Sequence, residues 1–244
     1  MIHKLYTELA SWWHLLSPPE EYLDEVAFFR EMLAASNLPT APTLLELGSG
    51  GGNNALYLKA DFAHVTLTDL SPQMLAMSRA INADCEHIVG DMRTLRLDRA
   101  FDVVFVHDAI DYMITLGDLR LAIETAFVHC TPGGLAIFVP DHVCETFQPD
   151  TDHGGSDSSD GSGRALRYME WTYDPDDSDT AYTVDYVYLL RENGQPTRVE
   201  HDQHINGLFP RDEWLRLLDE VGFRPEIVND QYGRDVFMAH RPLL

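Results

Sequence analysis

A glycine-rich turn and an acid about 20 residues after it are the first features of this sequence that could do chemistry. The turn follows a short apolar run and reads ELGSGGG over residues 46–52. Glycines let a backbone turn sharply and approach a ligand closely between a strand and a helix. Asp69 ends the next apolar run, where a carboxylate can accept hydrogen bonds from both hydroxyls of a ribose. The pair predicts a binding site for a ligand that contains a nucleoside.

A nicotinamide-dependent dehydrogenase would use the same strand, turn and acid. Its fingerprint requires a glycine at the third residue after the second conserved glycine, and the sequence has Asn53 at that place. The spacing found instead is Gly48, Gly50 and Gly52. An acid, Glu46, also stands two residues before the first of these glycines. Both differences disfavour a dehydrogenase.

The string ELGSGGG resembles motif I of class I S-adenosylmethionine-dependent methyltransferases, and residues 43–139 carry the resemblance well. The string TDLSPQML at 68–75 resembles the second motif of that family, and GDMR at 90–93 resembles the third. Each motif alone has a plain structural explanation, because Asp69 or Asp91 could simply cap the next turn. Three motifs in the correct order are more specific, and they imply that the cofactor is S-adenosylmethionine.

The resemblance implies a role for each matching residue. The methionine part of the cofactor lies against the turn, with Glu46 oriented toward its amino end, and Asp69 holds the ribose. Leu70 flanks the adenine, and Asp91 accepts a hydrogen bond from the adenine amino group. The residues of the three motifs expected to contact the cofactor are Glu46, Gly48, Ser49, Gly50, Asn53, Asp69, Leu70, Met74, Asp91 and Met92.

The loop VHDAIDY at 106–112 corresponds in that family to the loop between cofactor and acceptor. Open α/β sheets bind ligands at the carboxyl ends of their strands, so His107 and Asp108 should face the cleft. We count His107 as a cofactor contact and, with Asp108, as a catalytic candidate, although solvation in a loop explains His107 equally well. Carboxylates beside a sulfonium favour a cationic or amine acceptor.

Methyl transfer is an in-line displacement at a saturated carbon. The protein must therefore align the acceptor and, for an amine or hydroxyl, arrange the loss of a proton. No metal is needed, and His204, in HINGLF at 204–209, is the histidine expected to help. A satisfied structural histidine is its alternative. Segments 145–147 and 207–209 resemble those of methyltransferases that dimethylate amino sugars on nucleotide carriers.

The amino-terminal segment is expected to form two helices. Residues 17–20, SPPE, read as a capping box, so the second helix should begin at Ser17. Its apolar residues share one face at helical spacing, and they are Tyr22, Val26, Phe29 and Leu33. In the family such helices fold over the cofactor as a lid, where an aromatic ring near the sulfonium could contribute about 0.5 to 2 kcal/mol. The lid residues assigned to the cofactor are Tyr6, Trp13 and Tyr22.

From residue 43 onward, short apolar runs alternate with helical stretches, which is typical of parallel strands joined by crossover helices. The fold class is therefore α/β, a Rossmann-like doubly wound and mostly parallel sheet. Ser71 should cap one helix, and residues 131–134 should end another. A helix at 211–221, ended by Gly222, is also expected. The predicted strands are 43–47, 65–68, 87–89, 103–106, 135–139, 226–229 and 236–239.

An antiparallel three-stranded insert is expected after the core. Residues 150–163, DTDHGGSDSSDGSG, have almost nothing to bury and predict a mobile loop. The insert strands follow at 165–173, 181–190 and 197–205, and the last two are joined through the turn signal Asn193-Gly194. The middle strand has an apolar face that needs cover from the main domain or a second subunit, so a homodimer through the insert is an expectation. The residues of this face are Tyr182, Val184, Tyr186, Tyr188 and Leu190.

Composition limits the partners. The 244 residues include 40 acidic and 17 basic ones, and the formal net charge of -23 disfavours nucleic acid and anionic membranes. Three cysteines without a CxxC pair indicate neither a zinc site nor a disulfide framework. No export signal or run of about 18 apolar residues is visible, so a cytoplasmic protein is expected.

These observations predict a methyltransferase that acts on a small polar molecule, by N-methylation of an amine or amino sugar, with O-methylation as the next choice. The alternative is a noncatalytic S-adenosylmethionine-binding or regulatory protein with the same fold. The expected organisation is a lid at 1–36, a cofactor-binding core at 37–140, an insert at 141–207 and a closing segment at 208–244.

Overall fold

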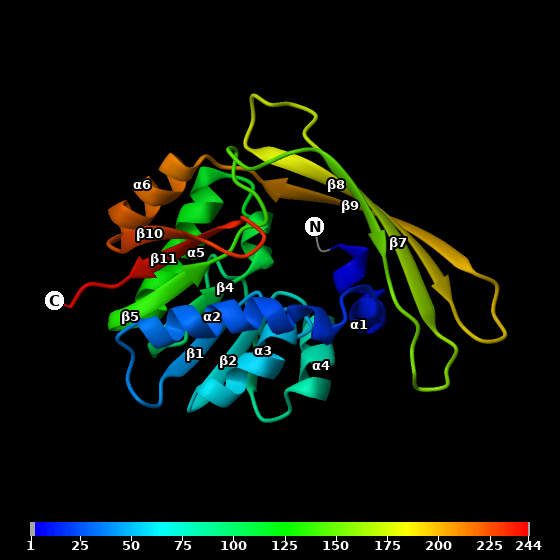
Figure 1. The fold of residues 1–244 in the computed structure, drawn as a ribbon, viewed down its shortest axis with the longest axis horizontal. Coiled ribbons are helices and arrows are strands. Elements are labelled where there is room, and N and C mark those ends of the chain that lie inside the picture. Colours follow the sequence, from blue (N-terminus) through cyan, green and yellow to red (C-terminus); the bar gives the residue numbers. More distant parts are fainter. Residues whose placement is uncertain (1–2, 244) are drawn as a thin grey trace.

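The computed structural model describes residues 3–243 and contains two β-sheets (Figure 1). The larger sheet has the strand order β10-β11-β5-β4-β1-β2-β3. Strands β1 to β5 run parallel, β11 is antiparallel to β5, and β10 is antiparallel to β11. This confirms the predicted fold class and every strand predicted for the main sheet. The strands are β1 Thr43–Leu47, β2 His64–Asp69, β3 Glu86–Val89, β4 Phe101–Val106, β5 Cys130–Phe138, β10 Arg224–Asn229 and β11 Asp235–His240.

Helices pack on both faces of this sheet and create two buried apolar clusters. One cluster contains residues of α5 and α6, including Trp214, whose ring stacks on Phe237 of β11 with centroids 4.7 Å apart. The other cluster contains Val26 and Phe29 of α2, as the spacing predicts. The longer helices are α2 Leu23–Ala35, α3 Asn53–Leu58, α4 Pro72–Ile81, α5 Leu116–His129 and α6 Arg211–Val221.

The predicted helix ends are partly confirmed. The Ser71 hydroxyl caps α4 by accepting from the Met74 N–H at 3.1 Å. Gly222 ends α6 in the left-handed region, with φ of 117°, a conformation that a glycine adopts without strain. In contrast, α5 ends at His129, and residues 131–134 already belong to β5.

The amino-terminal segment differs from the prediction, because no helix begins at Ser17. Pro18 is extended, with φ of -62° and ψ of 137°, and a 3-10 turn begins only at the next residue. A residue before a proline avoids the helical region, so the second of two successive prolines keeps the first one extended. The Ser17 hydroxyl instead bonds the Tyr22 hydroxyl at 2.9 Å. The short elements here are η1 Lys4–Tyr6, η2 Ala10–Trp12, α1 Trp13–Leu16 and η3 Pro19–Tyr22.

The insert is an antiparallel sheet of four strands in the order β6-β7-β8-β9. The strand that the sequence prediction assigned to a loop is β6, whose side chains are nearly all exposed. An edge strand needs only backbone hydrogen bonds to β7, so its composition gave no apolar signal. The four strands are β6 Asp150–Gly154, β7 Ala165–Tyr173, β8 Ala181–Arg191 and β9 Arg198–Gly207.

The inner face of the insert is covered by the same chain. The apolar face predicted on β8 points inward, and Tyr188 and Leu190 pack there against Leu5, Leu9 and Trp12 of the amino-terminal segment. Figure 1 shows this segment between the two sheets, beside the carboxyl ends of the parallel strands. Even-numbered residues of β9 share the inner face, because side chains alternate along a strand. Within residues 3–243 no helix is long and apolar enough to cross a membrane.

Candidate cofactor and acceptor site

The glycine-rich turn leaves β1 as a narrow cradle. Gly48 has a φ of 75°, and a Cβ there would lie 2.3 Å from the Cβ of Ala109. A Cβ on Gly51 would lie 2.1 Å from the Trp13 ring. The turn is therefore enclosed by the loop after β4 on one side and by the predicted lid residue Trp13 on the other. Only glycine fits at these two positions.

Two polar atoms beside the cradle lack partners. Oε2 of Glu46 and Oγ of Ser49 are buried and make no hydrogen bond to any residue in 3–243. Burial raises the pKa of the Glu46 carboxyl to about 8. Buried polar atoms are normally paired, and the ammonium and carboxylate of a methionine moiety would supply a donor and an acceptor here. The residues present therefore fit S-adenosylmethionine, with Glu46 and Ser49 at its amino-acid end.

Asp69 ties the turn to the next strand. Its Oδ2 accepts from the Gly50 N–H at 2.8 Å, and its Oδ1 accepts from the Ser71 N–H at 2.7 Å. Burial raises the pKa of Asp69, although these N–H groups oppose the shift. Each carboxylate oxygen keeps a further lone pair, so the same side chain can also accept from ribose hydroxyls. Turn capping and ribose binding by Asp69 are therefore compatible.

The remaining motif residues surround the position expected for the adenine. Leu70 is half-exposed, as a residue that flanks a ligand should be, and Met74 and Met92 are buried behind the turn. Asp91 is already engaged, because Arg93 contacts both of its oxygens, the closer at 2.6 Å. If the adenine amino group also donates to Asp91, as the resemblance implies, adenine and Arg93 bind the same carboxylate.

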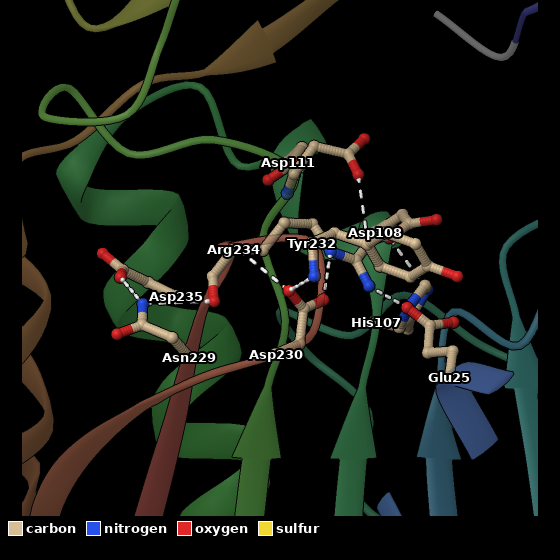
Figure 2. A network of polar contacts seen from close by, with 10 residues as sticks. Glu25, His107, Asp108, Asp111, Asn229, Asp230, Tyr232, Arg234 and Asp235 are labelled. Carbon is tan, nitrogen blue, oxygen red and sulfur yellow. Dashed lines mark hydrogen bonds and ion pairs between the residues drawn. The ribbon is translucent and has the colours of Figure 1, made fainter. Parts of the chain in front are cut away.

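Figure 2 shows a network that joins three segments at the carboxyl end of β4. The Glu25 carboxylate of α2 pairs with Nε2 of His107 at 2.9 Å and accepts from the Arg234 guanidinium. Nδ1 of His107 lies 2.8 Å from Oδ1 of Asp108. Arg234, in the turn between β10 and β11, also donates to Asp230 at 2.8 Å. The network fixes α2 against β4 and the closing hairpin.

Both ring nitrogens of His107 are engaged in this network. Burial lowers the pKa of His107, but the charge and hydrogen bond of Asp108 outweigh it and raise the pKa to about 9. The ring is therefore a cation at neutral pH, and a protonated imidazole has no lone pair with which to take a proton. This geometry favours a positioning role for His107 over the catalytic role expected from its place after β4.

Three aspartates gather where β4 and β5 end. The side chains of Asp108 and Asp141 are each 43% exposed, whereas Asp111 is buried and accepts from the Asp141 N–H at 2.9 Å. Burial and the charge of Asp108 raise the pKa of both Asp111 and Asp141. A cavity of about 340 Å³ opens beside Asp108. Its lining residues are Ser17, Glu21, Tyr22, Glu25, His107, Asp108, Tyr232 and Arg234.

A second chain of hydrogen bonds includes the predicted His204. The Tyr6 and Tyr112 hydroxyl oxygens lie 2.5 Å apart, and the Tyr112 oxygen lies 2.8 Å from Nδ1 of His204. Nε2 of His204 lies 3.3 Å from Oδ2 of Asp202. A carboxylate only accepts, so Nε2 carries the hydrogen, Nδ1 accepts from Tyr112, and Tyr112 accepts from Tyr6. The lone pairs of the Tyr6 oxygen are left to accept from another group.

Among residues 3–243, one group of side chains has the spacing of metal ligands. Ligand atoms of His3, Asp202 and His204 lie within 4.8 Å of one another. The two imidazole planes are tilted by only 31°, with centroids 3.9 Å apart, so the rings stack more than they converge. His204 also has partners at both nitrogens. These contacts are those of a hydrogen-bonded cluster.

The structure brings the predicted residues into two neighbouring groups. The motif residues surround the turn together with Trp13 and Tyr6, whose carbonyl accepts from the Ser71 hydroxyl. Tyr22 reaches the end of the turn through Ser17, whose hydroxyl bonds the Tyr22 hydroxyl and whose carbonyl accepts from the Asn53 amide. The Tyr22 ring centroid lies 6.4 Å from that of His107.

Asp108 follows β4, and its neighbour Ala109 lies against Gly48 of the turn. His204 lies on β9 and is linked to Tyr6 through Tyr112. The predicted acceptor residues thus lie next to the predicted cofactor residues.

Several residues of the site were missed, among them Asp111 and Asp141. Asp202 could have been found from His204, because residues two apart share a strand face. Tyr112 lies in the loop already singled out. Glu25 and Arg234 are 209 residues apart, and no local pattern in a single sequence pairs two such positions.

Replacing Asp69 with Asn should weaken S-adenosylmethionine binding by about 10- to 100-fold, because hydrogen bonds to a charged acceptor are lost. Calorimetric titration measures the affinity. The matched control is Asp61→Asn, which removes an exposed carboxylate paired with Arg30 and should bind like the wild type. Unchanged affinity of the Asp69 variant would mean that the ribose is held elsewhere.

Replacing Glu46 with Gln should stabilise the ligand-free protein increasingly as pH rises. The folded carboxyl has a pKa of about 8 against an ordinary 4.5, so the folded state holds a proton that the unfolded state has lost, and wild-type stability falls between these values. The variant should gain about 10 °C in Tm on the wild type between pH 5 and pH 9. The exposed Glu226→Gln serves as control. A Tm difference between the wild type and the Glu46 variant that stays constant across this pH range would contradict a raised pKa for the buried Glu46 carboxyl.

Comparison with known proteins agrees with this site. Residues 44–134, which include all three motifs, match the family model described as a methyltransferase domain. A sugar N,N-dimethyltransferase of Streptomyces venezuelae, named for dTDP-3-amino-3,4,6-trideoxy-alpha-D-glucopyranose, is 27% identical over 209 residues, which are 85% of this chain and 86% of the relative.

Solved structures share the fold across both sheets. The crystal structure of DesVI from Streptomyces venezuelae superposes with a TM-score of 0.83 at 23% identity, covering 95% of this chain and 97% of that one. An S-adenosylmethionine-bound amino pentose methyltransferase from Micromonospora echinaspora gives 0.76 at 25% identity, with 90% and 91% covered. The turn, the acid after β2 and these matches lead to one conclusion: the chain is a class I S-adenosylmethionine-dependent methyltransferase.

Proposed function

We propose that this methyltransferase transfers methyl groups to the nitrogen of an amino sugar. The observation that carries the proposal is the gathering of Asp108, Asp111 and Asp141 beside the cofactor turn, since carboxylates attract and orient an ammonium group. Relatives that are named as N,N-dimethyltransferases of amino sugars support the same acceptor. A hydroxyl acceptor lacks the positive charge that these carboxylates would attract.

The chain's own residues align the two reactants. When bound, S-adenosylmethionine supplies an electrophilic methyl group on its sulfonium. Glu46, Ser49 and Asp69 would hold the cofactor at its two ends. Asp108 and Asp141 would hold the acceptor from the ends of β4 and β5. Alignment of two bound molecules can account for much of the acceleration of a displacement at carbon.

The amine must also present a lone pair to the methyl group. The Tyr6 carbonyl accepts from Ser71 beside the cofactor turn, and the Tyr6 hydroxyl oxygen lies 2.5 Å from that of Tyr112, in the loop that also carries Asp108. Burial raises the pKa of Tyr6, so the phenol stays protonated. Its oxygen accepts from the amine N–H while its hydrogen points to Tyr112. His204, backed by Asp202, orients this chain and is the group that can take up a proton.

We also propose that two copies pair through the outer face of the insert. The inner face is covered by the amino-terminal segment, so the outer face is the one left for a partner. Large apolar side chains are exposed there by 44% to 62%. Such patches on a sheet commonly mark an interface. Those residues are Met169, Trp171, Leu189 and Val199.

Incubation with labelled S-adenosylmethionine should move label to an amino sugar and not to the matching sugar with a hydroxyl in place of the amine. Mass spectrometry should show the product with one and then two added methyl groups on nitrogen. Label in the hydroxyl sugar at an equal rate would overturn the choice of nitrogen.

A variant in the hydrogen-bond chain of Tyr6, Tyr112 and His204 tests the role of this chain in the same assay. Tyr112→Phe breaks the link to His204 and should lower kcat by about 10- to 100-fold while leaving cofactor affinity unchanged. Tyr173→Phe removes a phenol that bonds Asp185 at 2.8 Å on the outer side of the insert, and it should not alter kcat. Equal kcat values for the two variants would show that this chain of hydrogen bonds takes no part in the reaction.

Sedimentation equilibrium tests the proposed pairing. The wild type should sediment at twice its 27.6 kDa mass. Trp171→Glu places a charge on the apolar face and should give the monomer, whereas Trp171→Phe should remain paired. A monomeric wild type at about 100 μM, well above the Kd of an ordinary specific complex, would refute the interface.

A further inference from the structure

The amino-terminal segment closes over the cofactor turn at Gly51. A Cβ on Gly51 would lie 2.3 Å from Nε1 of Trp13 and 3.1 Å from Nε2 of His14. Nε2 of His14 also lies 3.3 Å from the Gly51 carbonyl oxygen, to which it can donate. At the end of the turn, the Asn53 amide donates to the Ser17 carbonyl at 3.0 Å. The segment therefore lies directly on the turn, with the nitrogen edge of the Trp13 indole against its backbone.

The indole nitrogen at this contact lacks a partner. Nε1 of Trp13 is buried and makes no hydrogen bond to any residue in 3–243. An indole N–H is a donor only. Buried polar atoms are normally paired, and an acceptor on a molecule bound at the turn would satisfy this one.

Three more polar atoms at the turn have no hydrogen-bond partner within residues 3–243. They are Oε2 of Glu46, Oγ of Ser49 and Oδ1 of Asn53, whose side chains are exposed by only 2%, 7% and 4%, respectively. The Asn53 nitrogen is the atom that donates to the Ser17 carbonyl, so the unpaired atom of this amide is the oxygen. With Trp13, four unpaired polar atoms from two separate segments surround one turn. This is the arrangement of a site that a polar ligand completes.

The backbone of the turn has little left to offer an anion. The N–H groups of Gly48 and Ser49 both donate to one carbonyl of β2, at 2.8 Å each. The Gly50 N–H donates to Asp69 at 2.8 Å, and the Gly52 N–H donates to the Ser49 carbonyl at 2.9 Å. A carboxylate held at the turn must therefore take its hydrogen bonds largely from side chains.

We infer that the Trp13 N–H and the Ser49 hydroxyl bind the carboxylate of the cofactor's methionine moiety. Glu46 and the Asn53 oxygen then bind its ammonium. The assignment follows from hydrogen-bond chemistry, because a carboxylate only accepts and an ammonium only donates. The Trp13 nitrogen can only donate and the Asn53 oxygen can only accept, so each has one possible partner on the zwitterion.

This role differs from the one expected for an aromatic residue of the lid. Trp13 acts through a hydrogen bond to the carboxylate, in place of an attraction between its ring and the sulfonium. The inference concerns the cofactor and holds for any methyl acceptor. It therefore does not depend on the proposed function.

Three ligands separate the two roles of Trp13. S-adenosylmethionine has a sulfonium and a carboxylate, S-adenosylhomocysteine has only the carboxylate, and decarboxylated S-adenosylmethionine has only the sulfonium. Trp13→Phe keeps an aromatic ring and removes the N–H. Calorimetric titration should show S-adenosylmethionine and S-adenosylhomocysteine weakened alike by about 10- to 100-fold, because each loses a hydrogen bond to a charged acceptor. The affinity for the decarboxylated ligand should not change.

The other outcomes of this titration overturn the inference. A loss confined to the two sulfonium ligands would assign Trp13 to the sulfonium. An equal loss for all three ligands would leave the ring with a packing role only, and no loss for any of them would remove the N–H from the site.

A second variant tests the same carboxylate from the turn itself. Ser49→Ala should reproduce the pattern, with both carboxylate ligands weakened and the decarboxylated ligand unchanged. The matched control is Trp12→Phe, because the Trp12 ring packs against Tyr188 and Leu190 of the insert, and it should leave all three affinities unchanged. If Ser49→Ala weakens the decarboxylated ligand as much as S-adenosylmethionine, the Ser49 hydroxyl does not bind the carboxylate and the inference fails.

Discussion

The buried carboxylate of Glu25 is the contact on which the rest of the cleft depends. A carboxylate that is 6% exposed must find positive charge inside the protein. His107 and Arg234 provide it from two other segments. A buried ion pair adds little net stability, but the loss of one partner costs about 3 to 5 kcal/mol. The carboxylate therefore acts as a geometric constraint: α2, the end of β4 and the hairpin of β10 and β11 can close in only one arrangement.

What could be predicted from sequence was what local spacing determines. The apolar runs predicted the parallel strands, Ser71 and Gly222 marked helix ends, and the spacing of the glycines and Asp69 indicated S-adenosylmethionine as the cofactor. These features depend on residues close together in the chain, because a strand, a turn and a cap are each formed within a few residues. The methyltransferase assignment rested on this local information, and it was correct.

What could not be predicted depended on distant partners or on competing local effects. A capping box was read at Ser17, but the second of two prolines kept Pro18 extended and moved the helix start. Residues 150–154 pair as a strand only because β7 lies beside them. His107 lies directly after β4, but its pKa depends on Asp108 and the partner of its second nitrogen is Glu25. Sequence position located this side chain without revealing what it could do.

The charge of the cleft poses a problem that the second hydrogen-bond chain can solve. Carboxylates attract an ammonium and also keep it protonated, since a nearby negative charge raises the pKa of an amine. A protonated amine has no lone pair for the methyl group. The acids that capture the acceptor would therefore hold it in its unreactive form unless a proton is removed.

Asp111 and Asp141, whose pKa values are raised, accept a proton more readily than an exposed aspartate. Tyr6, Tyr112 and His204 offer a second route, away from the ammonium. Capture and deprotonation thus belong to different residues of one cleft, which accounts for the presence of both networks beside the cofactor turn.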